Sequence, residues 1–161
     1  GRIQAAVRHD GPELSERLAE LREARVPVRE LGEREFLLPG FVDTHIHLPQ
    51  FPYAGTGIDK PLMAADGFLA KYAFPTERGM ADVDRAAAVY GQALEQLLQH
   101  STTTALMYAS SHLEASKALV DLAIQRRGPR CCVGKVCMDR HSPDGYVEET
   151  DRSLQDTQVF I

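Results

Sequence analysis

The stretch LPGFVDTHIH, residues 38–47, places two histidines two residues apart at the end of an apolar run. Side chains alternate between the faces of a strand, so His45 and His47 are predicted to point the same way, about 7 Å apart. Asp43 is predicted to share that face. Two neutral imidazoles presented together can bind one divalent ion of the zinc type. The alternative interpretation is that both histidines are packing residues.

The sequence around this stretch alternates between predicted strands and predicted helices. Apolar residues at helical spacing and apolar or β-branched runs separate the two kinds of element. Strands are predicted over 35–47, 101–109 and 130–139, and helices over 81–100, 111–129 and 148–161. Asp82 is predicted to cap the first of these helices, and Ser111 with Glu114 to form a capping box for the second.

This order of elements indicates an α/β fold with a parallel sheet and right-handed crossovers. Periodicity alone does not separate a doubly wound sheet from a barrel. A (β/α)8 barrel takes about 250 residues, whereas residues 36–161 number 161 − 35 = 126. If the fold is a barrel, the chain holds about half of it. We expect the chain to fold poorly alone, because 131–138 would be an apolar edge strand without its neighbour.

Two segments are less regular. Residues 1–35 are predicted to hold a short strand at 2–7, a helix at 11–25 and an extended run at 26–31. The segment 48–77 is rich in glycine, proline and aromatic residues. A connection of this length in a compact domain is usually functional.

Composition narrows the function classes. The net charge of −5 argues against nucleic acid as a partner, and no apolar run approaches the ~18 residues that cross a bilayer. Cys131, Cys132 and Cys137 are predicted to be buried free thiols, which favours a reducing compartment, the cytosol. Lys135 is predicted to be structural, and His112 to mark a helix start or lie at the surface.

The run LPGFVDTHIH resembles the first barrel strand of the amidohydrolase superfamily, whose pattern is PGxxDxHxH. The blocks QFPYAGTGIDKPL, FLAKYAFPTE, STTTALMYAS and VGKVCMD closely resemble successive blocks of the guanine deaminase family. The similarity runs from about residue 30 to the C-terminus and more faintly before it. It implies that 1–35 is the end of a small β-sandwich-like domain and 36–161 the first three βα units of an incomplete metal-dependent hydrolase barrel.

The resemblance also implies a site and a reaction. His45 and His47 match two zinc ligands, and Gln50 matches the glutamine that helps to hold the purine. Asp43 matches the motif aspartate, which either orients a ligand imidazole from behind or ties down the strand. The implied reaction is zinc-dependent hydrolysis of guanine to xanthine and ammonia, in guanine catabolism. The family also implies a homodimer for the complete protein, with no membrane partner.

Part of the implied machinery does not occur in this sequence. In the family, two further histidines, an aspartate and the proton-shuttling glutamate of an HxxE motif lie on later strands, and the sequence contains no HxxE. We therefore expect an N-terminal fragment of a guanine deaminase that is inactive alone. The alternatives are a truncated, non-catalytic product, or another zinc amidohydrolase or deaminase. The latter is not expected to share the IDKPL and KYAFPTE blocks.

Overall fold

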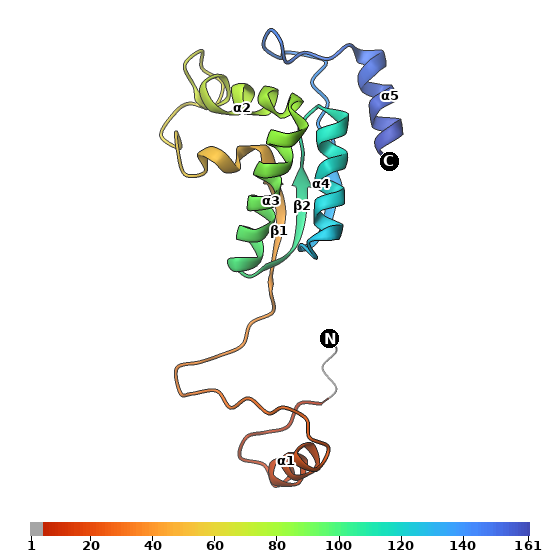
Figure 1. Ribbon diagram of the computed structural model, residues 1–161. Helices are drawn as coiled ribbons and strands as arrows, with labels where there is room; N and C mark the ends of the chain where they lie inside the picture. The colour runs from red at the N-terminus through yellow and green to blue at the C-terminus, as the bar shows by residue number, and fades with distance from the viewer. Residues whose placement is uncertain (1–4) are drawn as a thin grey trace. The chain divides into compact units, whose positions relative to one another are not determined.

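A computed structural model of the chain describes residues 5–161 and divides it into two units, Gly1–Leu38 and Pro39–Ile161. The described part of the first unit holds one helix, α1 (Glu13–Glu23), and no strand (Figure 1). The strand predicted at 2–7 lies partly outside the described residues, and 26–31 has no strand pairing. That 1–35 is the end of a β domain stays a prediction.

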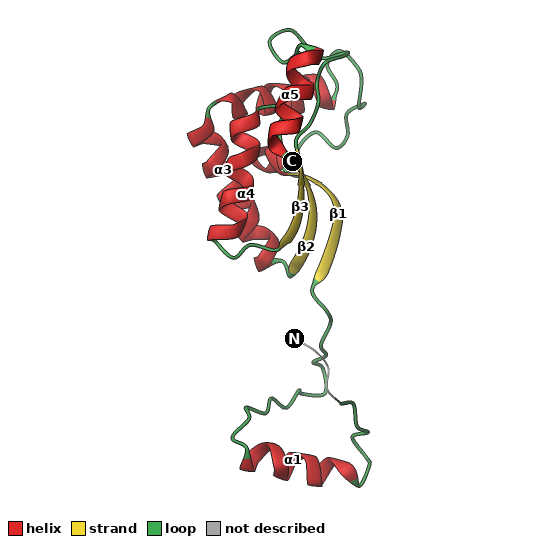
Figure 2. Ribbon diagram, turned by 90° about the vertical axis from the view of Figure 1, so that its right-hand side faces the viewer, coloured by secondary structure: helices red, strands yellow, loops and turns green. Residues whose placement is uncertain are grey.

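The second unit is built on a parallel sheet of three strands in the order β1-β2-β3. The strands are β1 (Phe41–His47), β2 (Thr102–Tyr108) and β3 (Arg130–Gly134). The helices that follow them are α3 (Val83–Gln99), α4 (Leu113–Gln125) and α5 (Thr150–Phe160). Figure 2 shows α3 and α4 on one face of the sheet. The predicted α/β alternation with a parallel sheet is confirmed.

The strand that carries the histidine pair is shorter and less regular than predicted. Residues 35–40 are not in a strand, and β1 begins at Phe41. Its register against β2 shifts between Asp43, which pairs with Ala105, and Ile46, which pairs with Met107. Three steps on β1 thus match two steps on β2, as at a bulge. The regular alternation of side chains between the two faces of the strand is therefore interrupted between Asp43 and the histidines. The prediction that Asp43 shares the face of the histidines assumed an uninterrupted alternation, which β1 does not have.

The two crossover helices begin differently. The Asp82 carboxylate accepts hydrogen bonds from the backbone N–H groups of Asp84 and Arg85, both at 3.1 Å, so the predicted cap of α3 is confirmed. The predicted capping box of α4 is wrong, because the helix starts at Leu113 with His112 as its N-cap and without a side-chain cap. His112 N–H donates instead to Ser110 Oγ at 3.3 Å.

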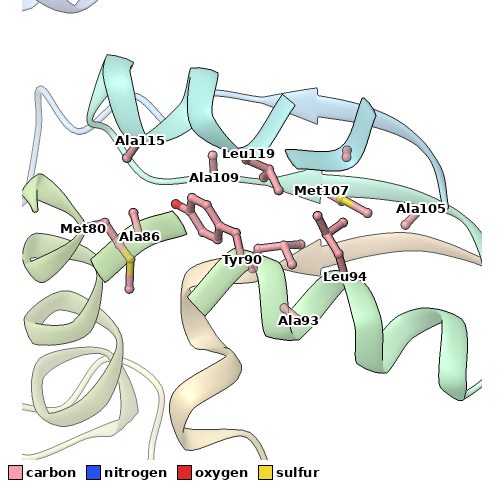
Figure 3. Close-up of a cluster of buried hydrophobic side chains, with 12 residues drawn as sticks. Met80, Ala86, Tyr90, Ala93, Leu94, Ala105, Met107, Ala109, Ala115 and Leu119 are labelled. Atoms are coloured by element: carbon pink, nitrogen blue, oxygen red, sulfur yellow. The ribbon is translucent and has the colours of Figure 1, made fainter. Parts of the chain in front are cut away.

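The hydrophobic core lies between the sheet and these two helices (Figure 3). Tyr90 and Leu94 of α3, Met107 of β2 and Leu119 of α4 are almost completely buried. Alanines fill the remaining positions and allow the helices to lie close to the sheet: Ala86, Ala93, Ala105, Ala109, Ala115 and Ala123. Each large buried side chain contributes roughly 1.5–3 kcal/mol through its removal from water.

The segment between β1 and α3 is more helical than predicted. It contains the 3-10 helix η1 (Leu48–Tyr53), a π-helical turn η2 (Leu69–Ala73), the short helix α2 (Phe74–Arg78) and a 3-10 turn η3 (Gly79–Ala81). Gly57 adopts φ +73°, and a Cβ there would lie 2.4 Å from the Tyr72 ring. Both conditions require glycine, so Gly57 allows the segment to turn tightly against Tyr72.

The cysteine prediction is wrong in one respect. Cys131, Cys132 and Cys137 are free, but all three are exposed rather than buried. Cys131 and Cys132 lie on β3, which forms an edge of the described sheet and lacks a neighbouring strand there, and Cys137 lies in the segment that follows it. None of the helices within residues 5–161 has the length and apolar character that a membrane crossing requires.

Candidate active site

The histidine pair lies at the carboxyl end of β1, the end at which α/β folds place their sites. The Nε2 atoms of His45 and His47 are 3.3 Å apart, and the ring centroids are 5.2 Å apart. The prediction that the two side chains point the same way is therefore correct.

The pair fits a zinc ion. Two nitrogens that bind one tetrahedral zinc at about 2.0–2.1 Å must lie about 3.3–3.4 Å apart, and the Nε2 atoms lie at 3.3 Å. The same distance fits an N–H···N hydrogen bond between the rings. No group of three or more His, Cys, Asp or Glu side chains within residues 5–161 is arranged to hold a metal ion. The pair thus supplies two ligands of the three that catalytic zinc sites usually take from protein.

Tyr108, the last residue of β2, lies against both histidines. Its ring centroid is 4.7 Å from that of His45 and 4.8 Å from that of His47, with the second pair stacked at 18°. Burial, with a smaller contribution from neighbouring His45, lowers the pKa of His47. The neutral imidazole is the form that binds a metal. Sequence reasoning missed Tyr108, although its place at the end of the second strand was a usable signal.

Asp43 contacts backbone rather than a ring. Its Oδ1 accepts a hydrogen bond from the backbone N–H of His45 at 3.0 Å. Of the two roles that the motif aspartate could have, this contact corresponds to tying down the strand. It fixes the backbone at the register shift and thereby the position of the first histidine.

A pocket of about 670 Å³ opens beside the pair. His45, His47, Gln50, Tyr53 and Phe68 are among its lining residues, so the structure brings the histidines and the predicted glutamine to one cavity. Tyr53 Oη and His47 Nδ1 are buried without a hydrogen-bond partner among the described residues. The pocket therefore combines apolar lining residues with the histidines and Gln50 as polar ones, as small-molecule sites do.

A buried polar cluster lies behind this pocket. Its carboxylate is Glu77 of α2, which accepts a hydrogen bond from Tyr146 Oη at 2.9 Å. Burial raises the pKa of Glu77, whereas the side chains of Tyr146 and Gln50 act in the opposite direction and lower it. Burial also raises the pKa of Tyr146, and that of Tyr90 to about 12. Sequence reasoning missed Glu77 and Tyr146.

Two other polar residues have structural positions. Lys135 has a fully buried side chain that pairs with Glu148 at 2.7 Å and also donates to the carbonyl oxygen of Val136. The second Glu148 oxygen accepts the backbone N–H of Met138 at 2.7 Å, which fixes the turn after β3. His112 is half-buried at the start of α4, and burial lowers its pKa. The structural interpretations of both residues agree with these contacts.

A protein-family comparison matches residues 36–159 to the amidohydrolase family. The match covers most of the chain and nearly all of the second unit. The chain belongs to the amidohydrolase family. This confirms the superfamily that the PGxxDxHxH pattern indicated.

The similar curated proteins are guanine deaminases. The chain is 48% identical over 134 residues to the guanine deaminase of Dictyostelium discoideum, and 41% identical over 136 residues to that of Homo sapiens. Each alignment covers 83% of this chain and 29% of the relative. This amidohydrolase chain thus spans under a third of the length of the relatives that it matches.

Solved structures give the same result. The guanine deaminase of C. acetobutylicum, crystallised with guanine bound in its active site, superposes with a TM-score of 0.71 at 35% identity. The E. coli guanine deaminase superposes with a TM-score of 0.64 at 36% identity. These alignments cover 76% of this chain and 28% and 26% of the two structures.

Proposed function

We propose that this chain is the N-terminal part of a zinc-dependent guanine deaminase, a hydrolase that converts guanine to xanthine and ammonia. One observation carries the proposal: two Nε2 atoms at zinc-ligand separation face a pocket that also contains Gln50. The similarity to guanine deaminases over 83% of the chain supports the choice of substrate.

Each residue has a role in this proposal. His45 and His47 hold the metal in their neutral forms. Tyr108 packs against both rings, stacked on that of His47 and tilted against that of His45, and so fixes their orientation. Gln50 binds the purine edge, since a carboxamide both donates and accepts hydrogen bonds. Zinc, when bound, would lower the pKa of a water molecule toward ~7 and so supply hydroxide at neutral pH.

The proposal divides the site between this chain and later sequence. Two imidazoles fall short of the three protein ligands of a catalytic zinc site, and deamination needs a carboxylate that moves a proton to the leaving nitrogen. We propose that both come from further strands of the same (β/α)8 barrel, in a cytosolic protein that is a homodimer when complete. The chain of 161 residues alone is then inactive.

The experiment begins with the messenger RNA beyond the codon of Ile161. We expect the frame to continue into an HxxE motif and then a further histidine and aspartate. The complete protein should bind zinc and release xanthine and ammonia from guanine, whereas the chain 1–161 should show no turnover. A zinc-loaded complete protein that leaves guanine unchanged would contradict the proposal.

The other outcome favours the non-catalytic alternative. If a stop codon follows Ile161 in the message, the histidine pair lacks its partners and the enzyme proposal is withdrawn for this product. Activity of the complete protein on another amino-purine or pyrimidine, but not on guanine, would indicate a different zinc deaminase.

A further inference from the structure

One side of the pocket is formed by an aromatic wall, which consists of Tyr53, Phe68 and Tyr72. Tyr53 and Phe68 line the pocket itself, with their ring centroids 5.7 Å apart. The Tyr72 ring packs against both of them, at 5.7 Å from Tyr53 and 6.1 Å from Phe68. Two of the three rings therefore belong to the segment 60–78, and the position of that segment determines the position of the wall.

The segment 60–78 is connected internally by local hydrogen bonds. The backbone N–H of Phe68 donates to the carbonyl oxygen of Pro61 at 2.9 Å. The π-helical turn η2, which contains Tyr72, continues directly into α2, and Thr76 Oγ1 of α2 donates to the Tyr72 carbonyl oxygen at 2.7 Å. A displacement of α2 is therefore transmitted to the aromatic wall.

The helix α2 is joined to a distant part of the chain through Glu77. Tyr146 Oη, in the segment after β3, donates to Glu77 Oε2 at 2.9 Å. The backbone N–H of Ser111, just after β2, donates to Tyr146 Oη at 3.4 Å. Because a backbone N–H can only donate, the Tyr146 oxygen accepts from Ser111 and its own proton is directed to Glu77. Tyr146 thus connects the segments that follow all three strands.

We propose that Tyr146 is a positioning residue, which holds α2 in place through Glu77 and thereby fixes the aromatic wall beside the histidine pair. This inference rests on the proposed function, in which the pocket receives guanine. Aromatic rings interact favourably only within a limited range of separations and orientations. A fixed wall therefore favours binding of a planar ring, and we expect Tyr146 to affect substrate binding rather than the step that breaks the C–N bond.

Packing alone does not account for the hydroxyl of Tyr146. Its ring lies 6.3 Å from that of Phe74 and 5.9 Å from that of His112, contacts that a phenylalanine would also make. The hydroxyl provides a donor to a carboxylate that is only 6% exposed, and a buried carboxylate without a donor is costly. Tyr90 differs, because its buried Oη has no hydrogen-bond partner among the described residues.

A double-mutant cycle in the complete protein tests the proposal. Tyr146→Phe should raise KM for guanine by about three- to tenfold, at most the worth of one net hydrogen bond, with kcat changed by less than about threefold. Glu77→Met removes the acceptor of the same hydrogen bond. Adding Tyr146→Phe to Glu77→Met should therefore have no further effect on KM. Tyr90→Phe, the same chemical change at another buried tyrosine, is the matched control and should leave KM unchanged.

A second measurement does not depend on activity. Exchange of backbone amide hydrogens, followed by mass spectrometry of peptides from the complete protein, reports how often a segment opens. We expect Tyr146→Phe to accelerate exchange over 60–78 and to leave peptides from α3 and α4 unchanged. Tyr90→Phe should leave exchange over 60–78 as it is in the wild type.

The outcomes separate the two proposals. The positioning role is wrong if Tyr146→Phe leaves KM unchanged, or raises it by the same factor with and without Glu77. It is also wrong if exchange over 60–78 stays the same, or rises equally in α3 and α4. If the wild type does not deaminate guanine but exchange in Tyr146→Phe rises only over 60–78, the proposed function fails while the connection between Tyr146 and α2 stands.

Discussion

The side chains on the two faces of the sheet differ in how deeply they are buried. The face toward α3 and α4 buries Ala105 and Met107 almost completely. Other residues of the sheet remain accessible, with Val42 of β1 64% and Leu106 of β2 36% exposed. The histidine pair and Tyr108 lie at the carboxyl end of the strands, where His45 and His47 line a pocket together with Ala93 and Leu97 of α3. The buried core is therefore on the helix side of the sheet, and the candidate chemistry is at the carboxyl end of the strands.

This division suggests that variants on the two sides will fail in different ways. A side chain on the helix side should affect folding with little effect on chemistry per folded molecule. A side chain of the histidine pair should affect chemistry with little effect on folding.

The largest effect is expected from His47→Ala in the complete protein. If His47 is a metal ligand of a guanine deaminase, as proposed, its loss should lower the rate of guanine deamination by at least ~10³-fold, more than loss of a group that only supports a ligand. The measurement is kcat together with zinc content. The zinc-free forms of variant and wild type should melt at about the same temperature. The exposed His9→Ala is the control, and retained activity in His47→Ala would exclude this residue as a ligand.

The helix side is tested by Leu119→Ala in the complete protein. This change leaves a cavity in the core and should lower the free energy of unfolding by about 2–5 kcal/mol, measured in urea. The rate per folded molecule should stay close to that of the wild type. Lys117→Ala, on the exposed side of the same helix, should cost no more than ~1 kcal/mol. Equal decreases in the free energy of unfolding for the two variants would mean that Leu119 does not belong to the core.

The open strands are tested in the chain 1–161. Leu106→Ser should reduce binding of a hydrophobic dye, by less than about twofold, because it removes one exposed apolar side chain from a larger patch. Met107→Ser, one residue along, should increase dye binding, because it disrupts the core. A sharp cooperative melt of a monomeric chain with no dye binding would contradict both expectations.

The smallest effect is the pH dependence that Glu77 contributes to stability. Its pKa in the folded state is raised above the ordinary value of 4.5, so the folded protein keeps a proton that the unfolded chain has released. Relative to Glu77→Gln, the wild type should be most stable below pH ~4.5 and lose stability as the pH rises to the raised value. Unfolding of both proteins across this range measures the difference. An opposite slope would mean that the hydrogen bonds to Glu77 outweigh its burial.

The fold was predictable where the signal is local. Asp82 followed by apolar residues at helical spacing predicts a cap and an inner stripe of Val83, Ala86, Tyr90, Leu94 and Leu97. The structure confirms the cap and buries Ala86, Tyr90 and Leu94, whereas Val83 in the first turn is 39% exposed. The start of α4 was missed because Ser111 directs its backbone N–H to Tyr146, 35 residues away. The register shift in β1 has no signature in the residues themselves, so the face of Asp43 was not predictable from alternation.

The residues of the candidate site also differ in how far the sequence predicts them. His45 and His47 were predicted to lie together from their spacing on a strand, and Gln50 was named from the family resemblance. The structure places all three at one pocket. Glu77 and Tyr146 are 69 residues apart and are joined only by the arrangement of successive strands. Cys131 and Cys132 were predicted to be buried from the apolar character of their strand, although the same strand was predicted to be an edge without its neighbour. The structure shows both exposed on β3, an edge of the described sheet.

The link between Glu77 and Tyr146 also has a consequence for biosynthesis. A ribosome releases the chain from its N-terminus, so Gln50 and Glu77 leave the exit tunnel while Tyr146 is still untranslated. During that interval the carboxylate lacks its tyrosine donor, and the helical segment around it has no tie to the later strands. The hydrogen bond that joins the segment after β1 to the segment after β3 is therefore formed only after the third strand and the turn beyond it have emerged.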